Sequence, residues 1–496
     1  MANGRYWLQT LGCPKNQVDS DKLAGKLAGE GFAPATGPED ADLVVVNTCA
    51  FIEAARKESV EAVLELAGAR RAGARLVVTG CMAERYGDEL ARALPEVDLV
   101  AGFGAALSPP AAAAPAPGAV PLALGPRRVG RSGPRRQPGA TEPAGDGPAG
   151  AGLAAGSFDL LELPRPATGA PWAYVKVAEG CDRRCGFCAI PSFRGAQRSR
   201  SLEAIMAEVA TLVGTPGGPG AGEPTGATGG AREIVLVAQD LVSYARDRRG
   251  SGRDASPTPG TGSGPGTRSP EAPIVALVRA VSALVPRTRL LYLYPSGLTD
   301  ELIEAILATG VPYFDLSLQH VSRPLLARMR RWGSGERFLR RIAEIRAADA
   351  LATMRSSFIL GYPGETEEDH DELLDFLRAA DLDWAGFFPF SPETGTPAAT
   401  MGDQVPPELA MERLRECSEL QDGITARRRD RLVGERRQVL VDAPGIGRTV
   451  HEAPEIDGVV HLPASPAPGT LVDVVVTASL GTDLVASPVG RPGESA

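Results

Sequence analysis

The amino-acid sequence predicts an α/β protein with three folded parts. Over residues 1–105, short β-rich runs alternate with helical runs, which predicts an open parallel sheet. Over residues 168–405 a strand-then-helix pattern repeats six times, and this predicts a partial (β/α)6 barrel because the closed barrel needs eight units. Residues 430–496 contain short strands separated by Gly and Pro turns, which favours a small β-barrel of the oligonucleotide-binding type.

Length, charge and hydropathy narrow the class of protein. The chain has 496 residues, a formal net charge of −9 and seven cysteines. This length predicts about two to four domains. No apolar run approaches a membrane span, and the N-terminal segment has no charged-then-apolar presequence, so we expect a cytoplasmic protein.

In the N-terminal part, each predicted strand runs directly into a cysteine. The predicted helices are Asp19–Glu30 and Ala54–Ala69, and the strands Tyr6–Leu11, Asp42–Val46 and Arg75–Val78 lead to Cys13, Cys49 and Cys81. Ligands of open parallel sheets gather at the carboxyl ends of the strands. We therefore expect these three cysteines, which are far apart in the sequence, to converge at one crevice.

Three segments rich in Ala, Pro and Gly interrupt the pattern. Residues 106–167 lack periodicity over most of their length and predict a flexible linker. Gly214–Gly230 and Arg248–Pro270 have a similar composition and fall between predicted elements of the central part, so we expect them to be surface loops.

The central part supplies the barrel elements. Helices are predicted at Leu202–Val213, Thr299–Ala308 and Glu367–Ala380, and the strands at Ala173–Ala178, Glu233–Ala238, Arg289–Tyr294, Tyr313–Leu318, Met354–Leu360 and Trp384–Phe390.

A connecting helix and the C-terminal barrel complete the chain. The helix is predicted at residues 406–429, where Cys417 is expected to be an ordinary helix residue. Strands follow at Gln438–Val441, Gly458–Leu462 and Leu471–Ala478.

The most informative motif is EGCDRRCGFCAIPSFR over Glu179–Arg194, directly after the first barrel strand. It places Cys181, Cys185 and Cys188 in a C-x3-C-x2-C array. Three thiolates can hold three corners of a 4Fe–4S cluster, which in an ordinary electron carrier takes four cysteines. The missing fourth ligand leaves one iron open for substrate chemistry, in contrast to a closed structural site.

Other interpretations of the triplet fit less well. Zinc usually takes four ligands, and no other Cys or His lies near these residues in the sequence. A disulfide framework conflicts with the odd number of cysteines and with a reducing compartment. Three unrelated buried thiols remain an alternative that the tight spacing disfavours.

The triplet changes the interpretation of the three N-terminal cysteines. A single cysteine after a strand is more often a small buried hydrophobic residue than a ligand. Three cysteines at equivalent positions, in a chain that is predicted to bind one cluster already, favour a second three-cysteine cluster.

The triplet resembles that of the radical S-adenosylmethionine (SAM) superfamily. In that superfamily the amino and carboxylate groups of the methionine moiety chelate the open iron. One electron from the cluster then cleaves the sulfonium, and the resulting 5′-deoxyadenosyl radical abstracts a hydrogen from an unactivated carbon.

Most of the chain outside the three inserted segments resembles the methylthiotransferases, in which a cysteine triad, the radical triplet and a C-terminal TRAM barrel occur in this order. The motifs indicate the RimO type, which modifies an aspartate of a small-subunit ribosomal protein. The matching motifs are LGCPKNQVDS from Leu11, AEGCDRRCGFC from Ala178, AQD at Ala238–Asp240, LQH at Leu318–His320, RSSFILGYPGETEED from Arg355, FPFSPETGTPA from Phe388 and APEIDGVV from Ala453.

The resemblance implies a reaction and its cofactors. An aspartate of small-subunit ribosomal protein twelve would be converted to 3-methylthioaspartate, with SAM as both methyl donor and radical source. An electron donor of the flavodoxin or ferredoxin class would act as a partner. Two 4Fe–4S clusters would be held by Cys13, Cys49, Cys81, Cys181, Cys185 and Cys188.

Further residues are candidates for binding SAM. Gln239 and Asp240 end the second barrel strand and would face the cofactor. Arg355 could pair with the methionine carboxylate. Gly361 and Gly364 would allow the backbone to approach the cofactor closely, although a turn glycine or a surface charge explains such residues equally well.

The charge of the C-terminal barrel bears on the partner. From Gln438 to the end, seven acidic residues face two arginines. An acidic barrel suits a basic ribosomal protein, whereas one that holds RNA should be basic. We expect Glu452, Glu455 and Asp457 to belong to this acidic surface and nucleic acid not to be the substrate.

Two other functions share part of the pattern. A transfer-RNA adenosine methylthiotransferase of the MiaB type would use every cysteine named above. A non-catalytic iron–sulfur protein would not need the complete radical-domain pattern.

Overall fold

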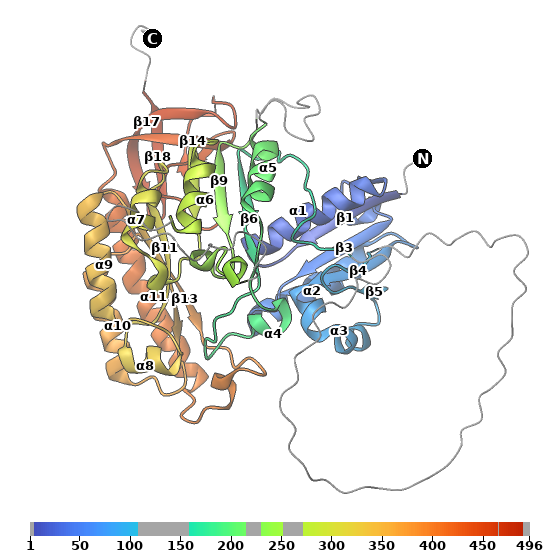
Figure 1. Ribbon diagram of the computed structural model, residues 1–496, viewed down its shortest axis with the longest axis horizontal. Helices are drawn as coiled ribbons and strands as arrows, with labels where there is room; N and C mark the ends of the chain where they lie inside the picture. The colour runs from blue at the N-terminus through green and yellow to red at the C-terminus, as the bar shows by residue number, and fades with distance from the viewer. Residues whose placement is uncertain (1–3, 108–157, 215–229, 251–270, 465, 490–496) are drawn as a thin grey trace, which may run out of the picture.

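The computed structural model describes residues 4–107, 158–214, 230–250, 271–464 and 466–489. Figure 1 shows the N-terminal α/β part beside the central barrel. The C-terminal barrel packs on the amino ends of the central strands. Among the described residues, no helix is both long and apolar enough to span a membrane.

The N-terminal part is a five-stranded sheet in the order β2-β1-β3-β4-β5 with all neighbours parallel, as predicted. Its central strands are almost wholly apolar, and Val44, Val45 and Val46 are fully buried because helices cover both faces. The elements are β1 (Gly4–Thr10), α1 (Pro14–Gly29), β2 (Phe32–Pro34), the 3-10 turn η1 (Pro38–Asp40), β3 (Leu43–Thr48), α2 (Glu53–Ala69), β4 (Arg75–Gly80), α3 (Cys81–Ala93) and β5 (Leu99–Val100).

The strand order creates a switch point in this sheet. From β1 the chain first adds β2 on one side and then crosses to place β3 on the other side. Open α/β sheets bind ligands in the crevice outside the carboxyl ends of the strands at such a point. The crevice lies where β1 and β3 end.

The central part contains six parallel strands in chain order. Two three-stranded sheets, β6-β9-β10 and β11-β12-β13, are joined by an isolated parallel bridge between Leu293 and Leu316. This arrangement confirms the predicted partial barrel. The strands are β6 (Trp172–Lys176), β9 (Glu233–Val237), β10 (Arg287–Leu290), β11 (Tyr313–Gln319), β12 (Thr353–Leu360) and β13 (Trp384–Pro389).

Helices cover the outside of these strands and begin at clear capping residues. Ser201 accepts a hydrogen bond from Ala204, and Thr366 forms a capping box with Asp369. The helices are α4 (Ile190–Arg194), α5 (Leu202–Val213), α6 (Pro273–Ser282), α7 (Asp300–Leu307), α8 (Arg323–Arg328), α9 (Gly335–Ala348) and α10 (Glu367–Ala380). A short ribbon of β7 (Ala178–Glu179) and β8 (Arg198–Ser199) and the 3-10 turns η2 (Leu241–Ser243), η3 (Asp247–Gly250), η4 (Pro295–Gly297) and η5 (Pro397–Thr400) complete this part.

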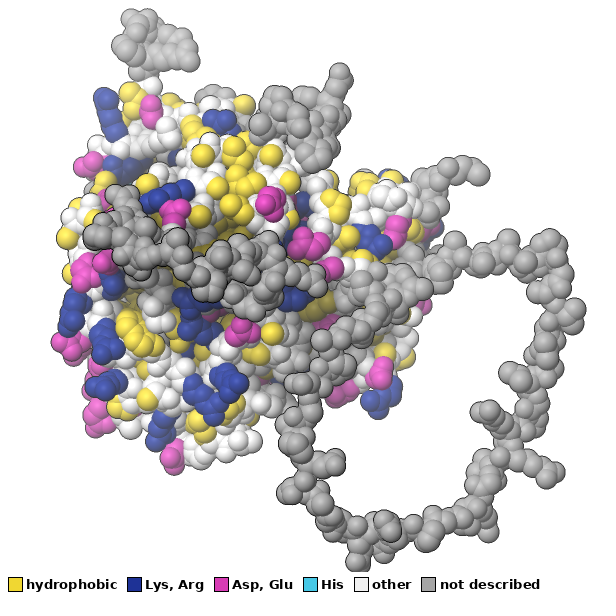
Figure 2. All heavy atoms as spheres, in the orientation of Figure 1, with side chains coloured by type: hydrophobic (Ala, Val, Ile, Leu, Met, Phe, Trp, Pro, Cys, Tyr) yellow, Lys and Arg dark blue, Asp and Glu magenta, His cyan; other side chains and the backbone are white. Residues whose placement is uncertain are grey.

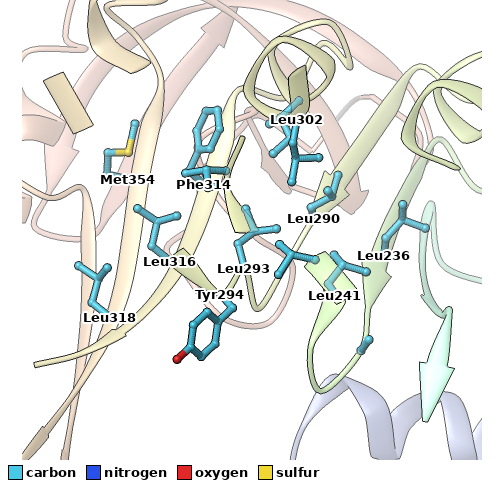
Figure 3. Packing of buried hydrophobic residues seen from close by; sticks show 14 of the residues in the cluster. Leu236, Leu241, Leu290, Leu293, Tyr294, Leu302, Phe314, Leu316, Leu318 and Met354 are labelled. Carbon is cyan, nitrogen blue, oxygen red and sulfur yellow. The ribbon is translucent and has the colours of Figure 1, made fainter. Parts of the chain in front are cut away.

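The barrel core is a continuous aliphatic cluster between strands and helices. Figure 3 shows Leu236, Leu290 and Phe314 from three strands meeting Leu302 of α7. Tyr294 lies at the edge of this cluster, and its hydroxyl points away from it. The core therefore fixes the loops that leave the carboxyl ends of the strands.

The C-terminal barrel is closed, as predicted, with the strand order β14-β15-β16-β18-β17. Val439, Val474 and Leu484 fill its interior. Its elements follow the connecting helix α11 (Pro407–Asp430), in which Cys417 is a fully buried free thiol, and are β14 (Arg436–Ala443), β15 (Ile446–Arg448), β16 (Val460–His461), β17 (Leu471–Leu480) and β18 (Asp483–Pro488).

The segments predicted as linker and loops fall mostly outside the described residues. This applies to residues 108–157, 215–229 and 251–270. The last residues of the predicted linker, 158–167, are ordered against the N-terminal part, whereas the sequence predicts a flexible segment. Leu160 and Leu161 are buried, and the Arg165 guanidinium pairs with Asp21 at 2.8 Å, so this stretch packs against the N-terminal part.

Buried ion pairs join the C-terminal barrel to the central one. The Glu233 carboxylate on β9 accepts from Arg289 at 2.7 Å and from Arg448 of β15 at 2.9 Å, and its side chain is fully buried. Arg287 donates to the backbone oxygens of Arg448 and Gln438. These contacts seat the C-terminal barrel on the amino ends of the central strands.

The predicted acidic surface on this barrel is wrong for two of its three residues. Glu452 is fully buried and pairs with Arg429. The Asp457 side chain is 2% exposed and pairs with Arg355 at 3.4 Å, so only Glu455 is exposed. A count of charges from sequence included carboxylates that face inward.

The buried Glu233 gives a stability test. Burial would raise the pKa of Glu233, but Arg289 and Arg448 outweigh it and lower the pKa to about 2. Glu233→Gln should reduce the free energy of unfolding at neutral pH by about 3–5 kcal/mol, because two buried guanidinium groups lose their counter-charge. Urea denaturation measures this difference.

The pH dependence and a surface control sharpen that test. Because the folded-state pKa is depressed, the stabilisation is complete above the unfolded-state value and is lost as the pH falls toward about 2. The difference in the free energy of unfolding between wild type and Glu233→Gln should therefore become smaller as the pH falls. Glu344→Gln, which breaks the exposed pair with Arg341, should cost less than about 1 kcal/mol, and an equal cost for both variants would contradict the assignment.

Candidate functional site

The three N-terminal cysteines lie at one edge of the sheet, as the strand pattern predicts. Cys13 caps the start of α1 after β1, Cys49 follows β3, and Cys81 opens α3 after β4. The three strands are adjacent in the sheet. A Cβ atom at Gly12 would lie 3.0 Å from the Cys49 sulfur, so the loop that carries Cys13 directly abuts Cys49.

Asn16 braces this edge. It is fully buried, and its amide nitrogen donates to the backbone oxygens of Leu11 at 2.9 Å and Thr48 at 3.1 Å. The amide oxygen lies 3.5 Å from the sulfur of Cys81. One side chain thus ties the ends of β1 and β3 to the start of α3.

The protonation of these thiols depends on their surroundings. Burial raises the pKa of Cys49 to about 12 and also raises the pKa of Cys81. For Cys13, Lys15, Arg194 and backbone N–H groups at the start of α1 outweigh burial and lower the pKa. Cys49 and Cys81 are therefore held in the protonated form, and a metal that binds them has to displace their protons.

The second triplet occupies the loop between β7 and α4. Cys181 accepts from the Arg183 backbone N–H at 3.4 Å, and the Arg331 guanidinium lies 3.5 Å from the Cys185 sulfur. Burial raises the pKa of Cys181 to about 11 and that of Cys188 to about 12. A metal bound here would likewise have to displace the protons of Cys181 and Cys188.

The backbone of this cysteine loop is clamped from both sides. The Gly186 N–H donates to the Met329 oxygen at 2.8 Å, and the Gly186 oxygen accepts from Ala398 at 2.9 Å. A Cβ atom at Gly186 would lie 2.7 Å from the Tyr362 hydroxyl. Glycine is therefore required between Cys185 and Phe187, because the neighbouring chain leaves no room for a side chain.

Two arginines and a tyrosine flank the triplet. The guanidinium carbons of Arg183 and Arg331 lie 3.6 and 4.1 Å from the ring centre of Tyr294. Arg183 also pairs with Asp240 at 2.6 Å. Figure 3 places Tyr294 at the edge of the barrel core, so the stack forms the boundary between that core and the cysteine loop.

A single arginine connects the two cysteine sites. Arg194 ends α4, six residues after Cys188, and donates from Nη2 to the Cys81 sulfur at 3.0 Å and to Asn16 Oδ1 at 2.7 Å. Its Nη1 donates to both carboxylate oxygens of Glu179 at 2.8 and 2.9 Å. The guanidinium thus connects the loop that carries the second cysteine triplet to the N-terminal triad.

This arginine belongs to a buried charge network. Lys176 donates to Glu179 at 2.5 Å and pairs with Asp19, which also lies 3.3 Å from Arg194. Burial would raise the pKa of Glu179, but Arg194 and Lys176 outweigh it and hold the pKa well below its usual range. Glu179 therefore remains charged, and its contacts together with those of Asp19 hold both cations in place.

Two of the predicted cofactor residues lie beside the cysteine loop. Gln239 donates from Nε2 to Glu179 at 2.8 Å, and its Oε1 is buried without a hydrogen-bond partner in the described structure. Asp240 is 3% exposed, and its Oδ1 likewise has no partner there. Buried acceptors that lack donors suit a ligand that brings N–H or O–H groups.

The other three predicted cofactor residues make close contacts within the protein. Arg355 is held by Asp315 at 2.8 Å and by Asp457, so its charge is already paired. Gly361 and Gly364 have φ values of +75° and +81°. A Cβ atom at Gly361 would lie 2.4 Å from the Ala410 Cβ, and one at Gly364 would lie 1.5 Å from the Arg328 Nη1, so packing within the protein requires these glycines.

No three His, Cys, Asp or Glu side chains in the described part of the chain come close enough together to hold a single metal ion. A 4Fe–4S cluster has a different requirement, because each thiolate binds a separate iron at a different corner. Two sets of three free cysteines, each on loops anchored by hydrogen bonds, meet that requirement in chemical type.

Several important residues have no role in the sequence-based prediction. Lys15, Glu179 and Arg194 lie inside quoted motifs, yet the cysteines alone explain those motifs at the level of sequence. Arg331 lies outside every motif. Only the approach of α4 to α3 and of the α8 end to the cysteine loop reveals these contacts.

Comparison with known protein families identifies three segments. Residues 5–102 match the Uncharacterized protein family UPF0004, residues 253–377 match the Radical SAM superfamily, and residues 433–489 match the TRAM domain.

Relatives that match over nearly the full length of the chain include proteins named ribosomal protein uS12 methylthiotransferase RimO. The ribosomal protein uS12 methylthiotransferase RimO of Moorella thermoacetica is 40% identical over 476 residues, covering 94% of this chain and 95% of that protein. Its namesake in Salinispora tropica is 40% identical over 518 residues, covering 98% and 95%. A solved structure of the radical SAM methyltransferase TsrM from Kitasatospora setae is similar at a TM-score of 0.45 and 15% identity, covering 95% of this chain and 80% of that one.

The contact between Gly12 and Cys49 gives a test of the N-terminal triad. Gly12 has φ +98°, and a Cβ there would meet both side-chain atoms of Cys49. Gly12→Ala should push Cys13 and Cys49 apart and remove about half of the iron that the protein takes up on anaerobic reconstitution. Gly29→Ala is the matched control, because nothing lies within 4 Å of that position. Full iron content in the Gly12 variant would contradict this geometry.

Proposed function

This chain belongs to the RimO family of ribosomal protein uS12 methylthiotransferases, and we propose that its two cysteine triads each hold a 4Fe–4S cluster for this reaction. The family relationship makes it a radical SAM methylthiotransferase that uses an iron–sulfur cluster. The observation that carries the two-cluster proposal is the Arg194 guanidinium, which contacts Cys81 of one triad from the helix that follows the other.

The first site is assigned to Cys13, Cys49 and Cys81. Support comes from their position at the carboxyl ends of adjacent strands and from the helices that begin next to them. In the first turn of α1 the backbone N–H groups of Lys15 and Asn16 point toward the Cys13 sulfur, which favours the negative charge of a thiolate-bound cluster. Lys15 and Arg194 add two positive charges at the same place.

The second site is assigned to Cys181, Cys185 and Cys188, with SAM bound beside it. The free acceptor atoms of Gln239 and Asp240 suit the amino group or hydroxyls of SAM. The prediction that Arg355, Gly361 and Gly364 also contact SAM stays a proposal. When bound, the cluster and SAM supply the radical that removes a hydrogen from the substrate. Arg183 and Arg331 bracket Tyr294 and fix this side of the pocket.

Residues of the chain itself fix the position of the two cysteine sites relative to each other. Glu179 immediately precedes the Gly180–Cys181 turn and binds Arg194, Lys176 and Gln239 at once. A rigid connection matters because a methylthio group carried at one site must meet a substrate radical generated at the other. A bidentate carboxylate–guanidinium pair provides such a connection with defined direction as well as charge.

We propose that the substrate is an aspartate of uS12, converted to 3-methylthioaspartate, and that a flavodoxin- or ferredoxin-class protein donates the electrons. The names of the full-length relatives support a ribosomal-protein substrate over the adenosine of transfer RNA. The charge of the C-terminal barrel gives no further support, since Glu452 and Asp457 are paired inside the protein. The face in Figure 2 likewise carries acidic and basic side chains interspersed, without a field of one sign.

Cluster content separates the two triads. Anaerobically reconstituted wild-type protein should contain about eight iron and eight sulfide per chain. Cys181→Ala should abolish formation of 5′-deoxyadenosine, because no iron remains to anchor SAM. Cys49→Ala should retain about four iron and part of the SAM cleavage while losing methylthio transfer. Methylthiolated product from the Cys49 variant at wild-type yield would refute a role for the first triad in sulfur transfer.

The substrate can be tested by mass spectrometry of uS12 and of transfer RNA from cells with and without the enzyme. We expect uS12 to gain one methylthio group in place of hydrogen only where the enzyme is present. Cells that carry the Cys188→Ala variant serve as the control for indirect effects. Unmodified uS12 together with enzyme-dependent methylthioadenosine in transfer RNA would overturn the substrate assignment.

A further inference from the structure

Lys15 is a buried cation at the centre of the molecule without an assigned role. It lies two residues after Cys13 in the first turn of α1 and is 9% exposed. Its ammonium nitrogen lies 3.3 Å from the ring centre of Tyr292. Burial lowers the pKa of Lys15, and Arg194 lowers it further, while Cys13, Asp315 and Glu179 act in the opposite direction. Lys15 therefore borders both the N-terminal triad and the barrel.

No carboxylate in the described structure forms an ion pair with Lys15. The two other buried lysines differ, since Lys176 pairs with Asp19 and Glu179, and Lys22 lies 3.8 Å from Glu208. A buried ammonium group without an anionic partner is costly, so its retention calls for a ligand that supplies one.

The carboxylates nearest to Lys15 are already engaged. Asp315 accepts from Arg355 at 2.8 Å and from the Tyr292 backbone N–H at 2.9 Å. Glu179 is bound by Arg194, Lys176 and Gln239. Neither can turn to Lys15 without leaving another buried cation or donor unpaired. Within the described structure the Cys13 thiol can offset part of the Lys15 charge, whereas a carboxylate partner for Lys15 has to come from outside it.

Tyr292 holds the ammonium group in place. It follows β10 by two residues at the carboxyl end of the barrel and adopts φ +66°, a strained conformation for a residue other than glycine. Such strain persists where the surrounding structure enforces it and is common at functional sites. The Tyr292 ring therefore orients Lys15 at the junction where the N-terminal triad meets the barrel.

We propose that Lys15 binds the side-chain carboxylate of the target aspartate, an assignment that rests on the proposed function. The reacting Cβ of an aspartate is bonded directly to its carboxylate carbon. A cation that fixes the carboxylate next to Cys13 thus fixes the Cβ between the two cysteine sites. The ammonium group also selects for an anionic residue over a neutral one, because a neutral ligand would leave the buried charge unpaired.

The competing role for Lys15 is to balance the charge of Cys13 and its cluster. That role predicts loss of iron on removal of the charge, with no effect on which substrate side chain is preferred. Substrate recognition predicts the opposite pattern. The two roles are therefore separated by measuring iron content and substrate discrimination in the same preparations.

The experiment is a double-mutant cycle with the reconstituted full-length enzyme. Anaerobic binding of labelled uS12 is compared with binding of uS12 in which the target aspartate is replaced by Asn. The enzyme variants are Lys15→Met, Lys15→Arg and Lys57→Met, the last being an exposed lysine of the same part of the protein. Lys15→Gln replaces the Met variant if that protein does not fold.

Wild type and the Lys57 variant should bind the aspartate form at least about tenfold more tightly than the Asn form. Lys15→Met should bind both forms equally while keeping its iron, and Lys15→Arg should restore part of the preference. Full discrimination by an iron-replete Lys15→Met enzyme, or loss of its iron with discrimination unchanged, would overturn the proposal. Wild-type enzyme that neither binds nor modifies uS12 would overturn the proposed function itself, and this assignment with it.

Discussion

The structure depends on the buried pair of Glu179 and Arg194. Glu179 precedes the second cysteine triplet and Arg194 follows it, so the pair closes the loop that carries the triplet. The same guanidinium reaches Asn16 and Cys81 in the N-terminal part. Without this pair, Lys176 and Asp19 would also lose part of their counter-charge, because all four groups share one buried network.

An arginine is well suited to this position. Its planar guanidinium presents several donors in fixed directions, and here they serve a carboxylate, an amide oxygen and a sulfur at the same time. A lysine would provide one point charge and could not span these partners. The relative placement of the two cysteine sites is thus set by one side chain and its two carboxylates.

In the C-terminal barrel, the number of acidic residues in the sequence does not give the charge of the surface. Glu233 joins Arg289 and Arg448, and Glu452 joins Arg429, all of them buried. Glu233 attaches the barrel to the central strands, Glu452 attaches it to α11, and neither carboxylate faces a partner. A net charge from sequence describes the whole chain, whereas recognition depends on the part that stays on the surface.

The sequence by itself determined the fold class, the order of the three parts and the convergence of the cysteines. Strand and helix periodicity is a local property, and the position of Cys13, Cys49 and Cys81 after successive parallel strands places them at one edge by topology alone. The C-x3-C-x2-C spacing is likewise local and needs no tertiary contact to be recognised.

Tertiary structure alone decided which contacts these residues make within the protein. Gly361, Gly364 and Arg355 occur in a motif that suggests cofactor binding, yet they pack against or pair with other parts of the chain. The contacts of Arg194 depend on the packing of α4 against α3. Those of Lys15 depend on the packing of the start of α1 against the loop after β10. Pairing of buried charges is a long-range property, because each partner comes from a different element and its energy depends on which groups exclude water together.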